Sequence, residues 1–155
     1  MKNENAKKDK QKAKHFLNLA GEYGVCAELF KRGVHAYITH GNQKAVDLFI
    51  TGAKKTFLLE VKTTNKKKFV TKFFQKYTSP EARPCPDFWV MACIDPVTLV
   101  TEFYVLTHKE TAQEQMTVNR QTVWEEVKGG MDNIPVNQLQ QYLGKWETII
   151  NAIEQ

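Results

Sequence analysis

Two short apolar segments, each with one acidic residue at an inner position, constrain the fold of this chain most. Residues 45–50 read Ala-Val-Asp-Leu-Phe-Ile, and residues 57–62 read Phe-Leu-Leu-Glu-Val-Lys. Segments this short, separated by a turn at Gly52, indicate two strands of a hairpin, at 45–50 and 56–63. Acidic residues are rare inside strands, because a buried carboxylate is costly unless it is paired or binds a metal. Asp47 and Glu60 are therefore the first candidates for functional residues.

Strand alternation predicts which side chains share a face. Glu60 and Lys62 point to one face of their strand, whereas Leu59 and Val61 point to the other. A hairpin would also bring Asp47 beside Glu60. Two carboxylates and a backbone carbonyl suit Mg²⁺, which keeps positions open for water and a substrate phosphate. The lysine would then help to form hydroxide or stabilise the attacked phosphate. For the Glu-x-Lys pattern alone, an ion pair on a solvated strand face is the alternative.

A helix is predicted over residues 14–31, ending at Gly33. At 100° per residue, Glu22 lies about 60° from Leu19, at the rim of the predicted apolar stripe. A glutamate at this rim can reach inward toward a site, or it can extend into water. The apolar stripe consists of Phe16, Leu19, Tyr23, Cys26 and Phe30.

The remaining segments complete an α/β pattern. The segment 65–77 favours either a helix or a basic loop. The order of helix, strands and helices predicts a central mixed β-sheet flanked by helices. Further strands are predicted at 34–39, 88–94 and 101–106, and further helices at 109–115, 121–127 and 136–152.

Length and composition set the expected class of protein. A chain of 155 residues with 42% hydrophobic residues fits a single domain, predicted here over residues 13–155. Residues 1–12 are basic with little to bury, which predicts a disordered arm. The three cysteines and four histidines show no CxxC, HxH or HExxH spacing, which argues against a zinc site or a disulfide framework. With no membrane-length apolar run and no signal peptide, a cytoplasmic protein is expected.

The positive charge is concentrated in the middle of the chain. Residues 54–76 hold eight lysines and one acid, whereas residues 110–155 hold three basic and seven acidic residues. A basic segment attracts polyanions such as DNA, although lysines also simply keep a small protein soluble. The candidate DNA-binding residues are Lys44, Thr63, Lys66, Lys67, Lys68, Lys72 and Lys76.

Taken together, these residues resemble the PD-(D/E)xK nuclease superfamily, which has the restriction-endonuclease-like fold. The pattern consists of Glu22 on a helix, Gly33, Val46-Asp47 and Glu60-Val61-Lys62, within about residues 16–64. The separations between Asp47 and Glu60 and between Glu22 and Gly33 are similar to those of archaeal Holliday junction resolvases. Val46 stands where the superfamily often has proline, a residue that many members lack.

The resemblance implies a metal-dependent DNA endonuclease. It implies catalytic roles for Glu22, Asp47, Glu60 and Lys62. Mg²⁺ or Mn²⁺ would bind Asp47, Glu60 and the backbone carbonyl of Val61, with Glu22 helping directly or through water. The substrate class stays open between Holliday junction resolution, restriction, phage defence and DNA repair, and a homodimer is expected for a resolvase.

Two alternatives come from other functional classes. In the first alternative, the chain is a non-catalytic nucleic-acid-binding module that keeps the nuclease fold. In the second, it is an interaction subunit whose acidic C-terminal helices dock a partner. The intact set of Asp47, Glu60 and Lys62 argues against a purely binding role, which has no need for it.

Overall fold

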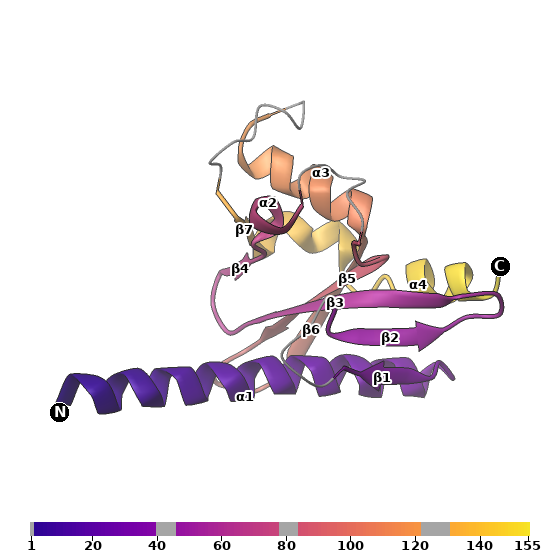
Figure 1. Ribbon diagram of the computed structural model, residues 1–155. Coiled ribbons are helices and arrows are strands. Elements are labelled where there is room, and N and C mark those ends of the chain that lie inside the picture. Colours follow the sequence, from indigo (N-terminus) through magenta and orange to yellow (C-terminus); the bar gives the residue numbers. More distant parts are fainter. Residues whose placement is uncertain (1, 40–45, 78–83, 122–130) are drawn as a thin grey trace.

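The centre of the molecule is a five-stranded mixed sheet (Figure 1). The computed structural model describes residues 2–39, 46–77, 84–121 and 131–155. The strand order is β1-β2-β3-β5-β6, in which β3 and β5 are parallel and the other neighbours are antiparallel. The predicted α/β fold with a mixed sheet is therefore confirmed. The strands are β1 Ala36–Ile38, β2 Leu48–Thr51, β3 Thr56–Thr64, β5 Phe88–Ile94 and β6 Thr101–Thr107.

Helices and a second, two-stranded sheet cover the central sheet. The small sheet pairs β4 with β7 in antiparallel fashion. Among the residues that the structure describes, no helix is both long and apolar enough to cross a membrane. These remaining elements are α1 Lys2–Lys31, β4 Lys68–Val70, α2 Phe73–Lys76, α3 His108–Val118, β7 Asn133–Pro135, the 3-10 helix η2 Val136–Tyr142 and α4 Glu147–Ile153.

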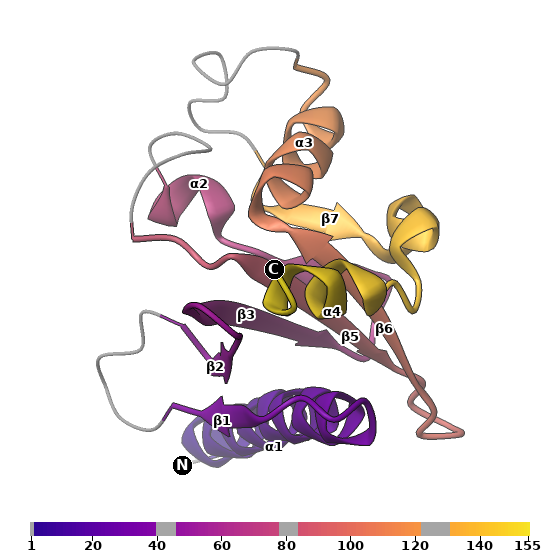
Figure 2. The ribbon, with the colours of Figure 1, turned by 90° about the vertical axis from the view of Figure 1, so that its right-hand side faces the viewer.

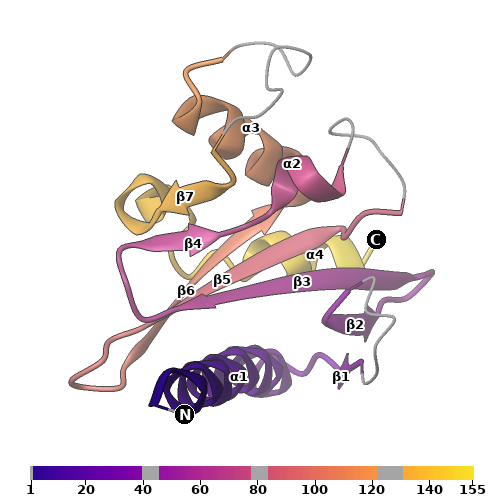
Figure 3. The same ribbon diagram turned by 60° about the vertical axis from the view of Figure 1, so that its left-hand side comes forward.

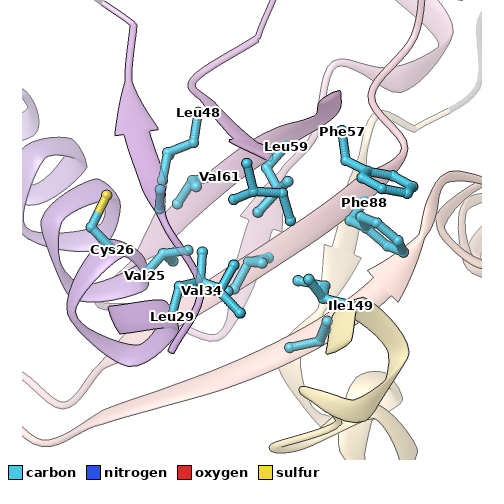
Figure 4. Packing of buried hydrophobic residues seen from close by; sticks show 14 of the residues in the cluster. Val25, Cys26, Leu29, Val34, Leu48, Phe57, Leu59, Val61, Phe88 and Ile149 are labelled. Carbon is cyan, nitrogen blue, oxygen red and sulfur yellow. The ribbon is translucent and has the colours of Figure 1, made fainter. Parts of the chain in front are cut away.

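Two hydrophobic clusters lie on opposite faces of the sheet. One joins α1 and α4 to the face that carries Leu59 and Val61 of β3 (Figure 4). The other joins α2, α3, η2 and the small sheet to the face that carries Trp89 and Met91 of β5. Figures 2 and 3 show this layering, with α1 on one side and α2, α3 and β7 on the other. Residues of β5 alternate between the clusters, which explains why its sequence is apolar throughout.

Helix α1 is longer than the sequence predicts. It begins at Lys2, so residues 2–12, which the sequence favours as a disordered arm, are helical. Residues 4–16 are exposed, and in Figure 1 this part projects beyond the sheet. Lysine, glutamate, glutamine and alanine are good helix formers, and extending a helix that is already formed avoids the cost of nucleation.

The predicted apolar stripe of α1 is wrong for its three aromatic residues. Phe16, Tyr23 and Phe30 are exposed, whereas Val25 and Leu29 are fully buried. Hydrophobic periodicity counts apolar residues but does not say which of two apolar stripes faces the sheet. The buried side is decided by close packing, because small and aliphatic residues let the helix approach β3.

Two further segments differ from prediction for local reasons. The segment 65–77 forms the short strand β4 and the single-turn helix α2 instead of one helix or loop. The helix predicted at 136–152 is interrupted at Gly144, which has a φ of 65°, a left-handed conformation that favours glycine. The helix predicted at 121–127 lies almost entirely outside the described residues.

Candidate active site

The site forms where β3 changes partners. Strand β2 pairs with β3 only as far as the rung Leu48–Leu59, and from Leu59 to Thr64 the registered partner of β3 is β5 on its other side. Asp47 immediately precedes β2, whereas the sequence predicted it inside a strand over residues 45–50. Its carboxylate oxygen Oδ2 accepts a hydrogen bond of 2.8 Å from the backbone N–H of Val61. The Asp47 carboxylate thus accepts a hydrogen bond that a backbone carbonyl would accept if the ladder continued.

Asp47 and Glu60 lie at the same end of this hairpin, just beyond its last pair, Leu48 and Leu59. Leu48 and Leu59 belong to the cluster on the α1 face. Glu60, the next residue of β3, therefore points to the other face of the sheet, where the charges of Glu60 and Asp47 both act on Tyr77. The backbone N–H of Asp47 donates to the carbonyl of Leu59 at 3.0 Å, which holds Asp47 beside β3. The hairpin predicted from sequence thus brings the two carboxylates together.

Two lysines converge on Glu60, whose side chain is only 3% exposed. Its Oε1 accepts hydrogen bonds from the ammonium groups of Lys62 and of Lys76, the latter at 2.7 Å. Lys62 comes from β3, and its ammonium lies 5.9 Å from the centroid of the Trp89 ring. Lys76 comes from α2 and contacts Glu60, a role that the sequence did not reveal. The two ammonium groups offset the cost of burying the carboxylate.

Tyr77 is a further residue of the site that sequence reasoning missed. Burial raises the pKa of its phenol well above the ordinary value, and the charges of Glu60, Cys85 and Asp47 add to this in that order. The phenol is therefore neutral near physiological pH and lies close enough to both carboxylates to feel their charge. A tyrosine at the end of a basic segment gives no sequence signal of such a place.

Glu22 approaches β3 from the α1 side and is 6% exposed. The adjacent Gly21 packs so closely on Thr63 that a Cβ at position 21 would lie 1.8 Å from the Thr63 hydroxyl oxygen. Burial, followed by the charge of Glu22, raises the pKa of the Cys26 thiol to about 11. Within the ranges that the structure describes, no three histidine, cysteine, aspartate or glutamate side chains gather closely enough to hold a metal ion. Glu22, Asp47 and Glu60 thus do not form a closed cage.

The donor set at the end of β2 fits a hard divalent cation that keeps several water ligands. Asp47 and Glu60 supply neighbouring carboxylates. The N–H and C=O groups of a strand residue point to the same side, so the carbonyl of Val61 faces the same edge as Asp47. The ammonium groups of Lys62 and Lys76 show that positive charge is already accommodated beside the Glu60 carboxylate. Two carboxylates and one carbonyl match the partial protein shell typical of Mg²⁺.

The predicted DNA-binding residues fall into separate places. Lys66 and Lys67, in the turn after β3, are exposed, as are Lys68 on β4 and Lys72 before α2. The side chain of Thr63 packs against Gly21 of α1. Lys44 lies outside the described residues.

Comparison with known proteins shows a nuclease-like fold. No protein-family model and no curated protein matches the sequence. Among solved structures, the chain is similar to a bacterial homing endonuclease, I-Ssp6803I, with a TM-score of 0.54 and 12% sequence identity. The match covers 88% of this chain and 91% of the other. At this level of identity the likeness establishes the shared fold, and function rests on the site residues.

Proposed function

We propose that this chain is a metal-dependent DNA endonuclease whose site consists of Asp47, Glu60, Lys62 and the carbonyl of Val61. The observation that carries the proposal is that Asp47 and Glu60 lie at one end of the hairpin, both near Tyr77, with Lys62 beside Glu60. A partly buried carboxylate beside a buried one costs stability unless it serves a purpose, and a cation between the two removes the repulsion. The fold shared with a homing endonuclease supports the same conclusion.

The chemistry proposed is hydrolysis of a phosphodiester. A bound Mg²⁺ or Mn²⁺ would polarise the phosphate and lower the pKa of a water ligand. Once its ammonium leaves Glu60, Lys62 would orient the attacking water or stabilise charge on the attacked phosphate, and it would deprotonate the water only after losing its own proton to become a neutral amine. Lys76 would hold the Glu60 carboxylate in position, and Glu22, which faces β3 from the α1 side, would contribute only around the end of β2.

The substrate proposed is DNA. Lys66, Lys67, Lys68 and Lys72 are exposed on the segment that leads from β3 to α2, the helix that supplies Lys76 to the site. Lysines placed so near a phosphodiesterase site would bind the phosphate backbone without reading bases. Resolution of junctions, restriction, phage defence, repair and homing-type cleavage are all compatible with this surface.

A non-catalytic DNA-binding module is the second candidate. It is favoured by the contacts of Glu60, because both Lys62 and Lys76 donate to the oxygen that a metal would need. In that case the ammonium groups stay on Glu60, and the cluster serves only to join α2 to β3.

Cleavage of a substrate panel separates these candidates. The panel contains plasmid, linear duplex, single strand, flap and four-way junction, each with Mg²⁺, with Mn²⁺ and with EDTA. Wild type is compared with Asp47→Ala and Lys62→Ala. DNA binding is measured for each protein on the same substrates.

Metal-dependent cleavage that both substitutions abolish, with DNA binding retained, supports the nuclease and defines its substrate. If no substrate is cut under any condition and Asp47→Ala binds DNA as wild type does, the binding module replaces the nuclease.

A further inference from the structure

The side of α1 that faces away from the sheet carries an apolar stripe, named here the α1 seam. Phe16 is 58% exposed, Tyr23 56% and Phe30 54%, and the alanines between them are exposed as well. Surface helices normally carry polar residues on this side, so an exposed apolar stripe indicates a contact surface. The α1 seam consists of Ala13, Phe16, Ala20, Tyr23, Ala27 and Phe30.

The spacing of the seam is that of a helix–helix contact. Its residues follow one another at intervals of three, four, three, four and three, the pattern of the apolar positions of a coiled coil. At 100° per residue the seam lies about 160° around the helix from the face buried on β3. Lys12 and Lys31 lie at the two ends of the seam, which itself carries no charge. Glu22 is buried toward the sheet, and Glu28 is paired with Lys31 and Arg32.

Small and large residues alternate along the seam. Along its six positions, alanine and an aromatic residue alternate strictly. Two copies of α1 packed antiparallel about a twofold axis would place residue i of one helix opposite residue 43 − i of the other. Each alanine then meets an aromatic ring: Ala13 faces Phe30, Phe16 faces Ala27, and Ala20 faces Tyr23.

We propose that the α1 seam binds a second copy of this chain in an antiparallel helix pair. The arrangement is isologous, since the same six residues serve both sides of the contact. A parallel pair would set ring against ring and alanine against alanine, which leaves gaps and clashes alternately. The half-buried Leu17 and Leu19 flank the centre of the seam and would extend the contact. In each copy the candidate active site lies on the face of the sheet opposite α1, so this inference does not depend on catalysis.

Sedimentation equilibrium of the purified full chain tests the proposal, because the seam can be altered without touching the buried core. Ala20→Tyr sets two rings against each other at the centre, and Tyr23→Ala leaves two alanines facing a gap. Each is expected to weaken the dimer at least about tenfold. In a mixture of the two variants, the enlarged position 20 of one chain meets the reduced position 23 of the other at one contact, and the second contact is the wild-type pair of Tyr23 and Ala20. The mixture is therefore expected to form a dimer again.

Ala53→Tyr, which enlarges an exposed alanine far from α1 in sequence, is the matched control and should dimerise as wild type does. Circular dichroism checks that every variant is folded. A wild-type mass of twice 17.9 kDa, lost in each variant and recovered in the mixture, supports the seam. A monomeric wild type into the millimolar range, a dimer that both variants leave intact, or a mixture that stays monomeric would each overturn the proposal.

Discussion

Two aspartates contact β3 in nearly the same way, but their surroundings differ. Asp47 precedes β2 and accepts from the N–H of Val61, whereas Asp87 precedes β5 and accepts from the N–H of Leu58 at 2.9 Å. Each also donates its own backbone N–H to a carbonyl of β3. The Asp87 carboxylate lies 3.3 Å from the ammonium of the exposed Lys55, while Asp47 lies near the buried Glu60. Both aspartates thus accept a backbone hydrogen bond from β3, but Asp87 does so beside a solvated lysine and Asp47 near another carboxylate.

The comparison shows that the position of the Asp47 carboxylate costs stability. A carboxylate that only anchors a strand is best placed beside a cation, as Asp87 is. Placing one beside a second buried carboxylate requires the neighbouring lysines, and it indicates a purpose other than stability. The following predictions test this difference, from the largest expected effect to the smallest.

Asp47→Asn should abolish most cleavage while leaving the protein folded. The amide keeps the shape and still accepts from Val61, but it removes one of the two charges proposed to hold the metal. We expect a loss of at least about 100-fold in kcat/KM and an unchanged or slightly higher Tm. Asp87→Asn is the matched control and should cleave as wild type does. Equal loss in both variants would remove the distinction between the two aspartates.

Asp87→Ala should destabilise the fold instead. It leaves the N–H of Leu58 without the side-chain acceptor at the start of β5, which should cost about 1–3 kcal/mol of unfolding free energy. Urea denaturation measures this cost, and cleavage at saturating metal should persist wherever the protein is folded. An unchanged denaturation midpoint would show that Asp87 does not anchor β3.

Lys76→Gln should reduce cleavage by about tenfold, because Glu60 loses the ammonium that comes from α2. Lys55→Gln removes the corresponding lysine at Asp87 and should leave the rate unchanged. Initial rates at equal concentrations of folded protein decide between these outcomes. A faster Lys76→Gln enzyme would mean that this lysine competes with the metal.

The Cys26 thiol should make stability fall at alkaline pH. Its pKa is raised from 9.0 to about 11, so the unfolded chain releases this proton first and gains free energy from doing so. The stabilisation from the protonated Cys26 thiol is fully present below pH 9 and is lost as the pH rises toward 11. At pH 10 this loss lowers the free energy of unfolding by about 1 kcal/mol. The difference between wild type and Cys26→Ala isolates it from other groups. Parallel pH profiles for the two proteins would contradict the burial of a neutral thiol beside Glu22.

The central part of the fold and site could be predicted from sequence because it is local. The hairpin that brings Asp47 near Glu60 spans a short segment, and strand alternation then fixes Lys62 on the same face as Glu60. The strand at 88–94 was also predicted with its observed bounds. Short-range periodicity decides such features without knowledge of the rest of the chain.

The parts that could not be predicted depend on distant contacts. Lys76 and Tyr77 reach the site only because the chain returns through β4 and α2, and no local pattern encodes that return. The buried face of α1 was misassigned because Phe16 and Tyr23 are more apolar than Gly21, whose lack of a side chain permits the close approach to Thr63. Packing between elements overrode hydrophobicity within one element.

Binding of Mn²⁺ measured by isothermal titration calorimetry tests the central claim, that Asp47 and Glu60 together hold a divalent cation. Wild type, Asp47→Asn, Glu60→Gln and the control Asp87→Asn are titrated without DNA under the same conditions. We predict binding to wild type and to Asp87→Asn, and its loss in both site variants. Binding of equal strength in all four proteins, or none in wild type, would contradict the account.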